Sequence, residues 1–366
     1  MSAKNVQTGL LKDFLETILQ KAGMPKPDAV IMAEGILKSD VMGFDSHGIN
    51  RLKPVYLDRI KDGIINPVTN ITIVREGPTT AVIDGNNGMG HVVSYHSMLL
   101  AIKKARQYGM GMVVVRNSNH YGFAGFYPLL AVNENMIGIT GTNARPSVAP
   151  TFGVEGMLGT NPLTFGFPTD EDFPFLLDCA TSTIQRGKVE LHARYGKELK
   201  QGWVINNQGI SKVNPKEVLD EIGIGQAALI PLGGAGEDMG GYKGYGYATV
   251  VEILSAALQQ GAFLHLLSGI ENGKKVPLKT GHFFIAIEIG AFTEPERFRE
   301  TTGTILRQLR TSRKVPGQDR IYTAGEKEFE ISRIRSQQGV PIEEDLLAEL
   351  RGLCKEYGLE EYLPHF

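Results

Sequence analysis

Residues 80–117 read TAVIDGNNGMGHVVSYHSMLLAIKKARQYGMGMVVVRN, two short apolar runs on either side of an amphipathic segment. The runs at 80–85 and 111–117 predict strands, the second of the buried, parallel type, and the segment 90–109 predicts a helix. Strand, helix and strand in this order form a βαβ unit, which favours an α/β fold. Ligands of open α/β sheets bind beyond the carboxyl ends of the strands, and NSNHYG at 117–122 lies at such an end.

Helical patterns lie at both ends of the chain. Three of them precede the βαβ unit, at 6–23, 27–42 and 51–63, and another, EEDLLAELRGLCKEYG, follows near the C-terminus at 343–358. The middle of the chain has short strands at 136–143, 163–168 and 174–180, then a helix at 183–196 and a buried strand at 282–290. With 366 residues the chain predicts two or three lobes, and the C-terminal helix is expected to pack on the N-terminal ones.

The composition disfavours several classes of protein. Lys plus Arg number 38 against 40 Asp plus Glu, a formal net charge of -2, so no basic field favours a nucleic acid or an anionic membrane as partner. Cys179 and Cys354 lack metal-ligand spacing, which predicts neither a zinc site nor a disulfide framework. No stretch reaches the ~18 apolar residues of a membrane span. We expect a cytoplasmic protein without a bound metal.

The familiar nucleotide and hydrolase motifs are missing. The sequence has no GxGxxG fingerprint, no P-loop, no GxSxG nucleophile elbow and no HExxH. A glycine-rich segment, 233–246, includes Lys243. Glycines let backbone N–H groups approach a phosphate, and the lysine adds a positive charge. A plain loop before a helix explains the same segment equally well.

His47 precedes Arg51 by four residues in DSHGINR, 45–51, where the second predicted helix ends. If a helical turn continues there, both side chains lie on one face. An arginine binds a carboxylate through two hydrogen bonds, and a histidine exchanges a proton near neutral pH. The pair therefore suits a substrate with a carboxylate and a reacting oxygen. The alternative is that His47 caps the helix and Arg51 pairs with Asp45.

His120 follows the second strand of the βαβ unit, among Asn117, Ser118 and Asn119. Small polar residues at a strand end are typical of a site and unusual in a core, although a surface loop is the simpler alternative. The remaining histidines show no metal-ligand pattern, and we interpret them as structural: His91, His96, His192, His265, His282 and His365.

Five segments together resemble the type-2 malate/L-lactate dehydrogenase family: SDVMGFDSHGINRL, NSNHYGFAGFY, GTNPLTFGFP, LDCATSTIQRGKVELHARYG and GGYKGYG. That family also includes ureidoglycolate, sulfolactate and diketogulonate enzymes and reductases of cyclic imines. The match runs in order from about residue 5 to residue 330, and five linked motifs are far more specific than one.

The resemblance implies a fold and an assembly. Family members bind NAD(P)H on a mixed-sheet α/β domain unlike the Rossmann fold, build a helical lobe from both chain ends and form homodimers. Applied to this chain, this predicts a helical lobe at 1–75 plus 320–366 and a cofactor-binding domain at 76–135 plus 235–319. An inserted α/β subdomain is expected at 136–234.

The resemblance also implies residue roles. His120 matches the histidine usually given the acid/base role, and His47 matches a second proposed proton donor. Arg51 matches the arginine that holds the substrate carboxylate, with Tyr56 and Ser46 as further substrate-binding residues. Oxidation of a 2-hydroxy acid requires a hydride to leave carbon while the hydroxyl loses a proton, and a positioned histidine typically accelerates such a step about 10²–10⁴-fold.

Seven residues match cofactor contacts of the family. The one with a chemical argument is Asp178, expected to accept hydrogen bonds from a ribose hydroxyl and to disfavour a 2′-phosphate, which favours NAD over NADP and leaves NADP open. Many members read proline-glycine-glutamate where this chain has Ala324 before the glycine, which puts the backbone geometry there in question. The full set is Asn143, Asp178, Ala180, Thr181, Lys243, Gly325 and Glu326.

The substrate expected from the resemblance is malate or oxaloacetate, the commonest activity of the family. Its second carboxylate then needs a further cation, for which Arg145 and Arg186 are candidates. Lactate, ureidoglycolate and diketogulonate are alternatives. A protein of another class, a non-catalytic NAD(P)H-binding dimer, has no need for His47, Arg51 and His120 together.

Overall fold

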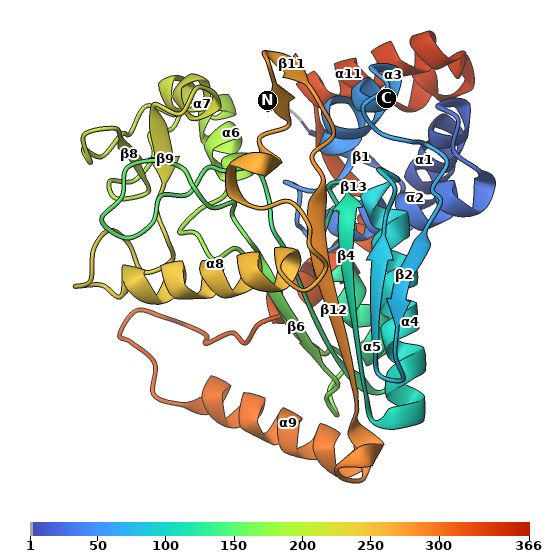
Figure 1. Ribbon diagram of the computed structural model, residues 1–366, viewed down its shortest axis with the longest axis vertical. Coiled ribbons are helices and arrows are strands. Elements are labelled where there is room, and N and C mark those ends of the chain that lie inside the picture. Colours follow the sequence, from blue (N-terminus) through green and yellow to red (C-terminus); the bar gives the residue numbers. More distant parts are fainter. Residues whose placement is uncertain (1–2) are drawn as a thin grey trace.

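The computed structural model describes residues 3–366 and has a seven-stranded sheet at its centre, in the order β2-β3-β4-β12-β5-β6-β7 (Figure 1). β3 and β4 pair in parallel, whereas all other neighbours are antiparallel. The sheet is therefore mixed, as predicted. Its strands are β2 (Thr72–Glu76), β3 (Thr80–Asp84), β4 (Met110–Ser118), β12 (Thr280–Glu288), β5 (Met136–Thr142), β6 (Leu163–Phe167) and β7 (Phe175–Cys179).

The parallel pair of strands confirms the βαβ unit. α4 (Gly90–Tyr108) connects β3 to β4 and buries its apolar face against the sheet. The helix ends where Gly109 adopts φ +88, a left-handed conformation that a glycine adopts without strain, and its N–H bonds to the carbonyl of Ala105. Val113 and Val115 of β4 are fully buried, in keeping with the continuous apolar run in the sequence.

One edge of the sheet collects the carboxyl ends of four strands. Two antiparallel steps separate β4 from β5, and two more separate β5 from β7, so β3, β4, β5 and β7 all run in the same direction. The residues that follow these strands, near 85, 119, 143 and 180, lie along this edge. We call this edge the ligand edge. Three of the predicted site segments lie along it, although they are far apart in the chain.

A helical lobe is built from both chain ends, as predicted. One hydrophobic cluster joins buried residues from 6–65 with others from 340–366, and Phe14 lies edge-on against the rings of Tyr362 and Phe366, with centroids 5.4 and 4.8 Å apart. In Figure 1 the blue and red ends of the ribbon lie side by side. The lobe contains β1 (Ala3–Val6) paired with β13 (Val340–Glu343), together with α1 (Thr8–Lys21), α2 (Lys26–Val41), α3 (Asp58–Lys61), α11 (Glu344–Tyr357) and η5 (Glu360–His365).

Residues 49–61 do not form the single helix that we predicted at 51–63. They form a 3-10 turn, η1 (Ile49–Arg51), a π-helical segment, η2 (Leu52–Leu57), and the short α3. Pro54 lacks the N–H that a regular α-helix needs at this position, and its ring opposes the α-helical packing of the preceding turn. The irregular segment places Tyr56, 1% exposed, inside the lobe.

A smaller unit beside the sheet has its own core, in which Val189, Val204, Val218 and Leu229 are buried. It lies at the upper left of Figure 1 and contains α6 (Arg186–Arg194), α7 (Pro215–Gly223) and the antiparallel pair β8 (Val204–Asn206) and β9 (Ala227–Leu229). The domain boundaries given above stay predictions.

The other elements connect these parts. Within residues 3–366 no helix is both long and apolar enough to cross a membrane. The connecting elements are α5 (Phe126–Val132), α8 (Gly241–Ala256), η3 (Leu264–Leu267), β10 (Ile270–Glu271), β11 (Lys274–Lys275), η4 (Ile289–Ala291), α9 (Pro295–Thr311) and α10 (Glu326–Gln338).

Candidate active site

The imidazole rings of His47 and His120 stack at the ligand edge. Their centroids are 5.7 Å apart and their planes differ by 10°. His120 stands just beyond β4, whereas His47 comes from the loop after α2, in the helical lobe. The two histidines that the sequence singled out, 73 positions apart by their residue numbers, therefore form one site between lobe and sheet.

The loop that carries His47 is folded over a buried carboxyl group. Asp40, 3% exposed, accepts a hydrogen bond from the N–H of Ile49 at 2.8 Å. A Cβ on Gly48 would lie 1.7 Å from Oδ1 of Asp40, so only glycine fits there. Burial raises the pKa of Asp40 to about 8, because a carboxylate loses hydration in the protein interior.

His47 and Arg51 do not share a face of a continuing helix. The N–H of His47 bonds to the carbonyl of Phe44, and the N–H of Arg51 to that of Gly48, so each belongs to a separate tight turn. The predicted helical spacing is wrong at this point. The buried Asp40, which draws the loop inward through Ile49, explains why the helix does not continue.

Arg51 is directed by contacts at both ends of its guanidinium group. Its Nε donates to the carbonyl of Ser46 at 2.6 Å, and its Nη2 lies 2.9 Å from a carboxylate oxygen of Glu190 on α6. The alternative pairing of Arg51 with Asp45 is wrong, because Asp45 pairs with Arg335 of α10. The hydroxyl of Ser46 lies 2.8 Å from Nδ1 of His47, which places it in the same group of residues.

Tyr56 contacts His120 from the helical lobe. Its hydroxyl lies 2.8 Å from Nδ1 of the imidazole. Burial raises the pKa of Tyr56 far above its usual value, so the phenol stays protonated. Because a phenol both donates and accepts, Nδ1 has a partner in either neutral tautomer, and the tautomer protonated at Nδ1 leaves Nε2 free to act as a base.

His91 is a member of this group that our sequence interpretation missed. It is 1% exposed, its ring lies 5.3 Å from that of Tyr56, and neither ring nitrogen has a hydrogen-bond partner among the described residues. A Cβ on Gly122 would lie 2.1 Å from its Nε2, and one on Gly35 2.8 Å from its Cδ2. The only sequence signal was its place beside Gly90, at the first turn after a predicted strand.

All three histidines are kept neutral by their surroundings. Burial, followed by the positive charge of Arg51, lowers the pKa of His47 to about 4. Burial lowers the pKa of His91 to about 3, and the charge that His47 would carry when protonated adds to this. Burial also lowers the pKa of His120 well below its usual value, and neighbouring His47, His91 and Arg51 add to this. Neutral imidazole is the form that accepts a proton.

The predicted cofactor residues near Asp178 follow β7 at the ligand edge, but Asp178 itself is already bonded. One carboxylate oxygen accepts from the N–H of Gly125 at 2.7 Å, and the other lies 3.4 Å from the hydroxyl of Thr164. Asp178 therefore holds the loop that leads from His120 to α5, and its expected bond to a ribose stays a prediction. Burial raises the pKa of Asp178 to about 6.

Asn143 also uses its side chain inside the protein. Its Oδ1 accepts from the N–H of Gly281 at 2.8 Å, and its Nδ2 donates to the carbonyl of Ala262 at 3.0 Å. It joins the end of β5 to the bulge at the start of β12. The cofactor contact at Asn143 stays a prediction.

The glycine-rich segment lies beside the end of β7. The N–H of Leu232 donates to the carbonyl of Thr181 at 2.9 Å, next to Ala180. The glycines pack the loop on itself: a Cβ on Gly241 would lie 1.9 Å from the carbonyl oxygen of Gly234. Packing within the loop thus accounts for these glycines.

A phosphate-binding role at this segment rests on its donors. The segment leads into α8, a helix of 16 residues, whose first N–H groups favour an anion. Lys243 stands in the first turn, 5.7 Å from the ring of Tyr242, and pairs with no carboxylate in the described part of the chain. This donor set fits the pyrophosphate of a dinucleotide.

Gly325 lies against the other end of β7. It adopts φ +93, and a Cβ there would lie 2.7 Å from the carbonyl oxygen of Pro174. The neighbouring Ala324 accepts a hydrogen bond through its carbonyl from the N–H of Leu176 at 3.3 Å. A proline in place of Ala324 would offer the same carbonyl for this hydrogen bond.

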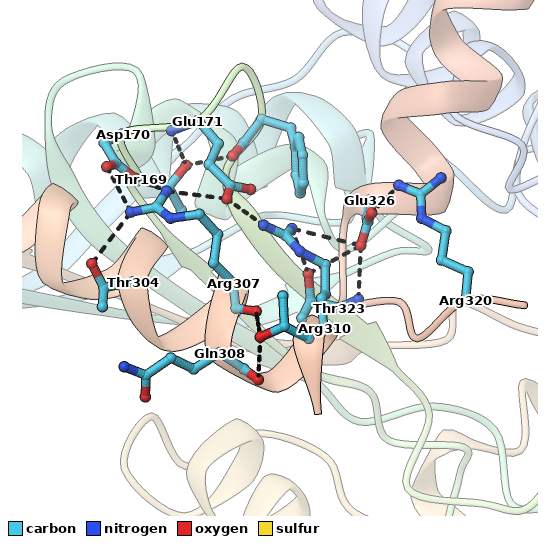
Figure 2. Close-up of polar contacts among 12 residues, drawn as sticks. Thr169, Asp170, Glu171, Thr304, Arg307, Gln308, Arg310, Arg320, Thr323 and Glu326 are labelled. Atoms are coloured by element: carbon cyan, nitrogen blue, oxygen red, sulfur yellow. Dashed lines mark hydrogen bonds and ion pairs between the residues drawn. The ribbon is translucent and has the colours of Figure 1, made fainter. Parts of the chain in front are cut away.

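Glu326 belongs to a network of ion pairs (Figure 2). Its carboxylate, 3% exposed, pairs with Arg320 and Arg310 and accepts from the N–H of Thr323 at 3.0 Å. Arg310 also pairs with Glu171 in the loop between β6 and β7. Burial alone would raise the pKa of Glu326, but these donors and charges lower it. The network holds α9 and the following loop against the sheet.

The two arginines considered for a second carboxylate differ in their contacts. Arg186 lies 3.3 Å from Glu190, the carboxylate that also binds Arg51. Arg145 follows β5, is exposed and has no hydrogen-bond or ion-pair partner within residues 3–366. No group of three or more His, Cys, Asp or Glu side chains in that range is arranged to hold a metal ion.

The chain is similar to known proteins over most of its length. A family model described as malate/L-lactate dehydrogenase matches residues 6–351. The malate dehydrogenase of Pyrococcus horikoshii is 44% identical over 350 residues, 96% of this chain and 94% of the relative. The L-sulfolactate dehydrogenase of Methanocaldococcus jannaschii is 37% identical over 362 residues, 96% of this chain and 97% of the relative.

A solved structure matches nearly the whole fold. The crystal structure of malate dehydrogenase from Entamoeba histolytica superposes with a TM-score of 0.95 at 45% sequence identity. The match covers 98% of this chain and 99% of that chain.

Proposed function

The chain belongs to the malate/L-lactate dehydrogenase family, and from this premise we propose that it interconverts malate and oxaloacetate with NAD(H). Membership makes it an oxidoreductase of 2-hydroxy acids that uses a nicotinamide cofactor. The choice of malate is supported by relatives named malate dehydrogenase at 44% identity. Lactate, ureidoglycolate and diketogulonate remain the alternatives within the family.

The observation that carries the assignment of roles is the stacking of His47 and His120 beside Arg51. Arg51 would exchange the single contact of its Nη2 with Glu190 for the substrate carboxylate, which a planar guanidinium can bind through two parallel hydrogen bonds. His120, neutral and held by Tyr56, accepts the hydroxyl proton during oxidation and returns it during reduction. The bound nicotinamide supplies the hydride acceptor and donor. Of the three rings, that of His91 is buried, whereas those of His47 and His120 are partly exposed.

The preference for NAD(H) over NADP(H) is part of the proposal. Its support is the charge of Asp178, whose pKa of about 6 leaves it ionised at neutral pH, at the end of β7. A 2′-phosphate near that carboxylate would be repelled. The ratio of kcat/KM for NADH and NADPH tests this, and a tenfold or greater preference for NADPH, at about 1.4 kcal/mol, contradicts it.

We also propose a cytoplasmic homodimer with the three domains predicted above. Support for a dimer comes from α8, where Tyr247, Val250 and Ile253 are 57%, 48% and 54% exposed and follow one another at helical spacing. Exposed apolar stripes of this kind mark protein interfaces. Light scattering coupled to size-exclusion chromatography measures the mass, and a monomer at micromolar concentration contradicts the dimer.

The function is tested by following oxidation of NADH and NADPH with a panel of 2-oxo acids. We expect turnover with oxaloacetate above that with the other acids. No turnover with any acid, from a folded protein that binds NADH, would favour the non-catalytic cofactor-binding dimer instead.

A further inference from the structure

The candidate site holds more positive charge than the described chain neutralises. Arg51 and Arg186 share one carboxylate, Glu190. Arg59 and Arg145 have no ion-pair partner among residues 3–366. His47 and His120 are neutral, so they supply no negative charge to balance these arginines. The site therefore has a surplus of unpaired cations after Arg51 has received its carboxylate.

The segment that carries Arg59 is tied to the segment of His120, and, after burial, the charge of Arg59 is among the causes that lower the pKa of His120. Arg59 stands on α3, and the residues after α3 are tied to the ligand edge: Asn87, which follows β3, donates from its side chain to the carbonyl of Ile64 at 2.7 Å. Asn119, next to His120, donates to Oδ1 of Asn87 at 3.0 Å. One chain of hydrogen bonds thus joins the segment of Arg59 to that of His120.

The guanidinium group of Arg59 is partly withdrawn from water. Its Nη1 is buried and has no hydrogen-bond partner in the described chain. Burial, followed by the charge of Arg145, lowers the pKa of Arg59, and Asp62 offsets this only in part. Asp62 lies 3.3 Å from Lys275 and not against Arg59. A buried donor without an acceptor costs free energy that an anionic ligand would recover.

Arg145 approaches the same space from the sheet. It follows β5, whose carboxyl end lies at the same edge as that of β4, which precedes His120. Arg145 is exposed, yet burial by surrounding protein, followed by the charge of Arg186, lowers its pKa. After burial, the charge of Arg145 is also among the causes that lower the pKa of Arg59, which indicates that the two guanidinium groups lie near one another. Neither has a carboxylate partner among residues 3–366.

We propose that Arg59 and Arg145 bind the second anionic group of the substrate while Arg51 binds its first carboxylate. The inference rests on the proposed function, since it takes the Arg51 contact from there. The site then selects 2-oxo and 2-hydroxy acids that carry another carboxylate or a sulfonate at the far end, and it discriminates against lactate and pyruvate. Arg186 is not part of this second site, because Glu190 already neutralises it.

The test compares oxaloacetate with pyruvate, which share the reacting 2-oxo acid group and differ in the second carboxylate. In Arg145→Gln, kcat/KM for oxaloacetate should fall about 10²-fold, the loss typical of a charge-assisted bidentate contact. The value for pyruvate should change by less than about threefold. Arg194→Gln, an exposed arginine at the end of α6, is the matched control and should change neither value.

Arg59 is tested with two variants because its burial makes folding a concern. Arg59→Lys keeps the positive charge but loses the planar guanidinium group, and Arg59→Gln loses both. Each should reduce the preference for oxaloacetate over pyruvate, with thermal melts close to wild type for the lysine variant. Sulfopyruvate, whose second anionic group is a sulfonate, is a third substrate: its kcat/KM should fall together with that of oxaloacetate in Arg59→Gln, and an unchanged value would overturn the inference.

A binding measurement separates this inference from the proposed function. Calorimetric titration of hydroxymalonate and of glycolate into the NADH-bound protein needs no turnover. Tighter wild-type binding of the diacid, lost in Arg145→Gln, supports the second anion site even if the enzyme reduces neither 2-oxo acid. Equal losses for both acids in the variants, or a wild type that handles pyruvate as well as oxaloacetate, overturn it and leave 2-hydroxy acid oxidation intact.

Discussion

The hydroxyl of Tyr56 lies 2.8 Å from Nδ1 of His120, so a residue of the helical lobe sets the orientation of a ring that stands on the sheet. The helical lobe and the sheet therefore both contribute residues to the site. This hydrogen bond also separates the two stacked histidines, because the nearest side-chain contact of His47 is instead the neighbouring hydroxyl of Ser46.

Removal of the Tyr56 hydroxyl should impair proton transfer and leave cofactor binding unchanged. In Tyr56→Phe we expect kcat to fall about 10–10²-fold, the effect typical of losing a partner that orients a reactive ring. The ring of Phe preserves the packing against His91. Steady-state kinetics over a pH series, with NADH affinity measured by fluorescence, checks the effect. An unchanged kcat with an unchanged pH profile would show that the hydrogen bond has no part in catalysis.

The two histidines should give different phenotypes. His120→Ala should depress kcat by about 10²–10⁴-fold while NADH still binds, because the lost interaction acts mainly in the transition state. His47→Ala should raise KM for the acid more than it lowers kcat. If the phenotypes are reversed, His47 is the residue that transfers the proton.

Local patterns were sufficient to predict much of this molecule. The apolar runs of β3 and β4 predicted the βαβ unit, which in turn placed His120 at the carboxyl end of a strand. The motif around His47 and Arg51 predicted a second part of the site. The helical patterns at both chain ends predicted the helical lobe, and the resemblance to a known family supplied the mixed sheet, which no local pattern specified.

The remaining features depend on contacts between distant parts of the chain. Glu190 meets Arg51 across 139 positions, and Gly125 meets Asp178 across 53. His91 looked like an ordinary position on an amphipathic helix, since its place beside Tyr56 depends on how α4 packs against the lobe. Periodicity reports which face of an element is buried, and not which side chain it is buried against.

Arg51 should tolerate neither alanine nor lysine. Lysine keeps the charge but not the planar fork, so both variants should lower kcat/KM for the acid by similar large factors, while cofactor affinity hardly changes. Steady-state kinetics with thermal melts as a folding control measures this. Wild-type kcat/KM in Arg51→Ala would rule out carboxylate binding by this residue.

Glu190 should compete with the substrate for Arg51. The ion pair is partly exposed, with side chains 18% and 27% accessible, and such pairs contribute about 0–1 kcal/mol. Glu190→Gln should therefore lower KM for the acid by up to about fivefold at low ionic strength, and the difference should shrink as salt screens the charge. A raised KM would mean instead that Glu190 orients Arg51 for binding.

Asp40 should make the stability of the protein fall as the pH rises toward 8. The pKa of Asp40 is about 8 in the folded chain, because the side chain is buried beneath the loop of His47. In the unfolded chain it has the ordinary aspartate value of 3.8. Asp45 raises the pKa of the folded chain further and Arg335 lowers it. Between these two values the folded state holds a proton that the unfolded state has lost, so the free energy of unfolding decreases as pH rises.

Asp40→Asn should remove that dependence. Asparagine can still accept the bond from Ile49 and cannot ionise, so the wild-type loss of about 1.4 kcal/mol per pH unit should be absent between pH 6.5 and pH 8. The lower limit avoids His47 and His91, whose lowered pKa values make stability rise with pH only below 6.5. Urea unfolding at several pH values measures the slope.

The control variant is Asp220→Asn, which replaces an exposed carboxylate on α7 and should keep the wild-type slope. A slope in Asp40→Asn equal to that of the wild type would show that Asp40 is ionised in the folded protein.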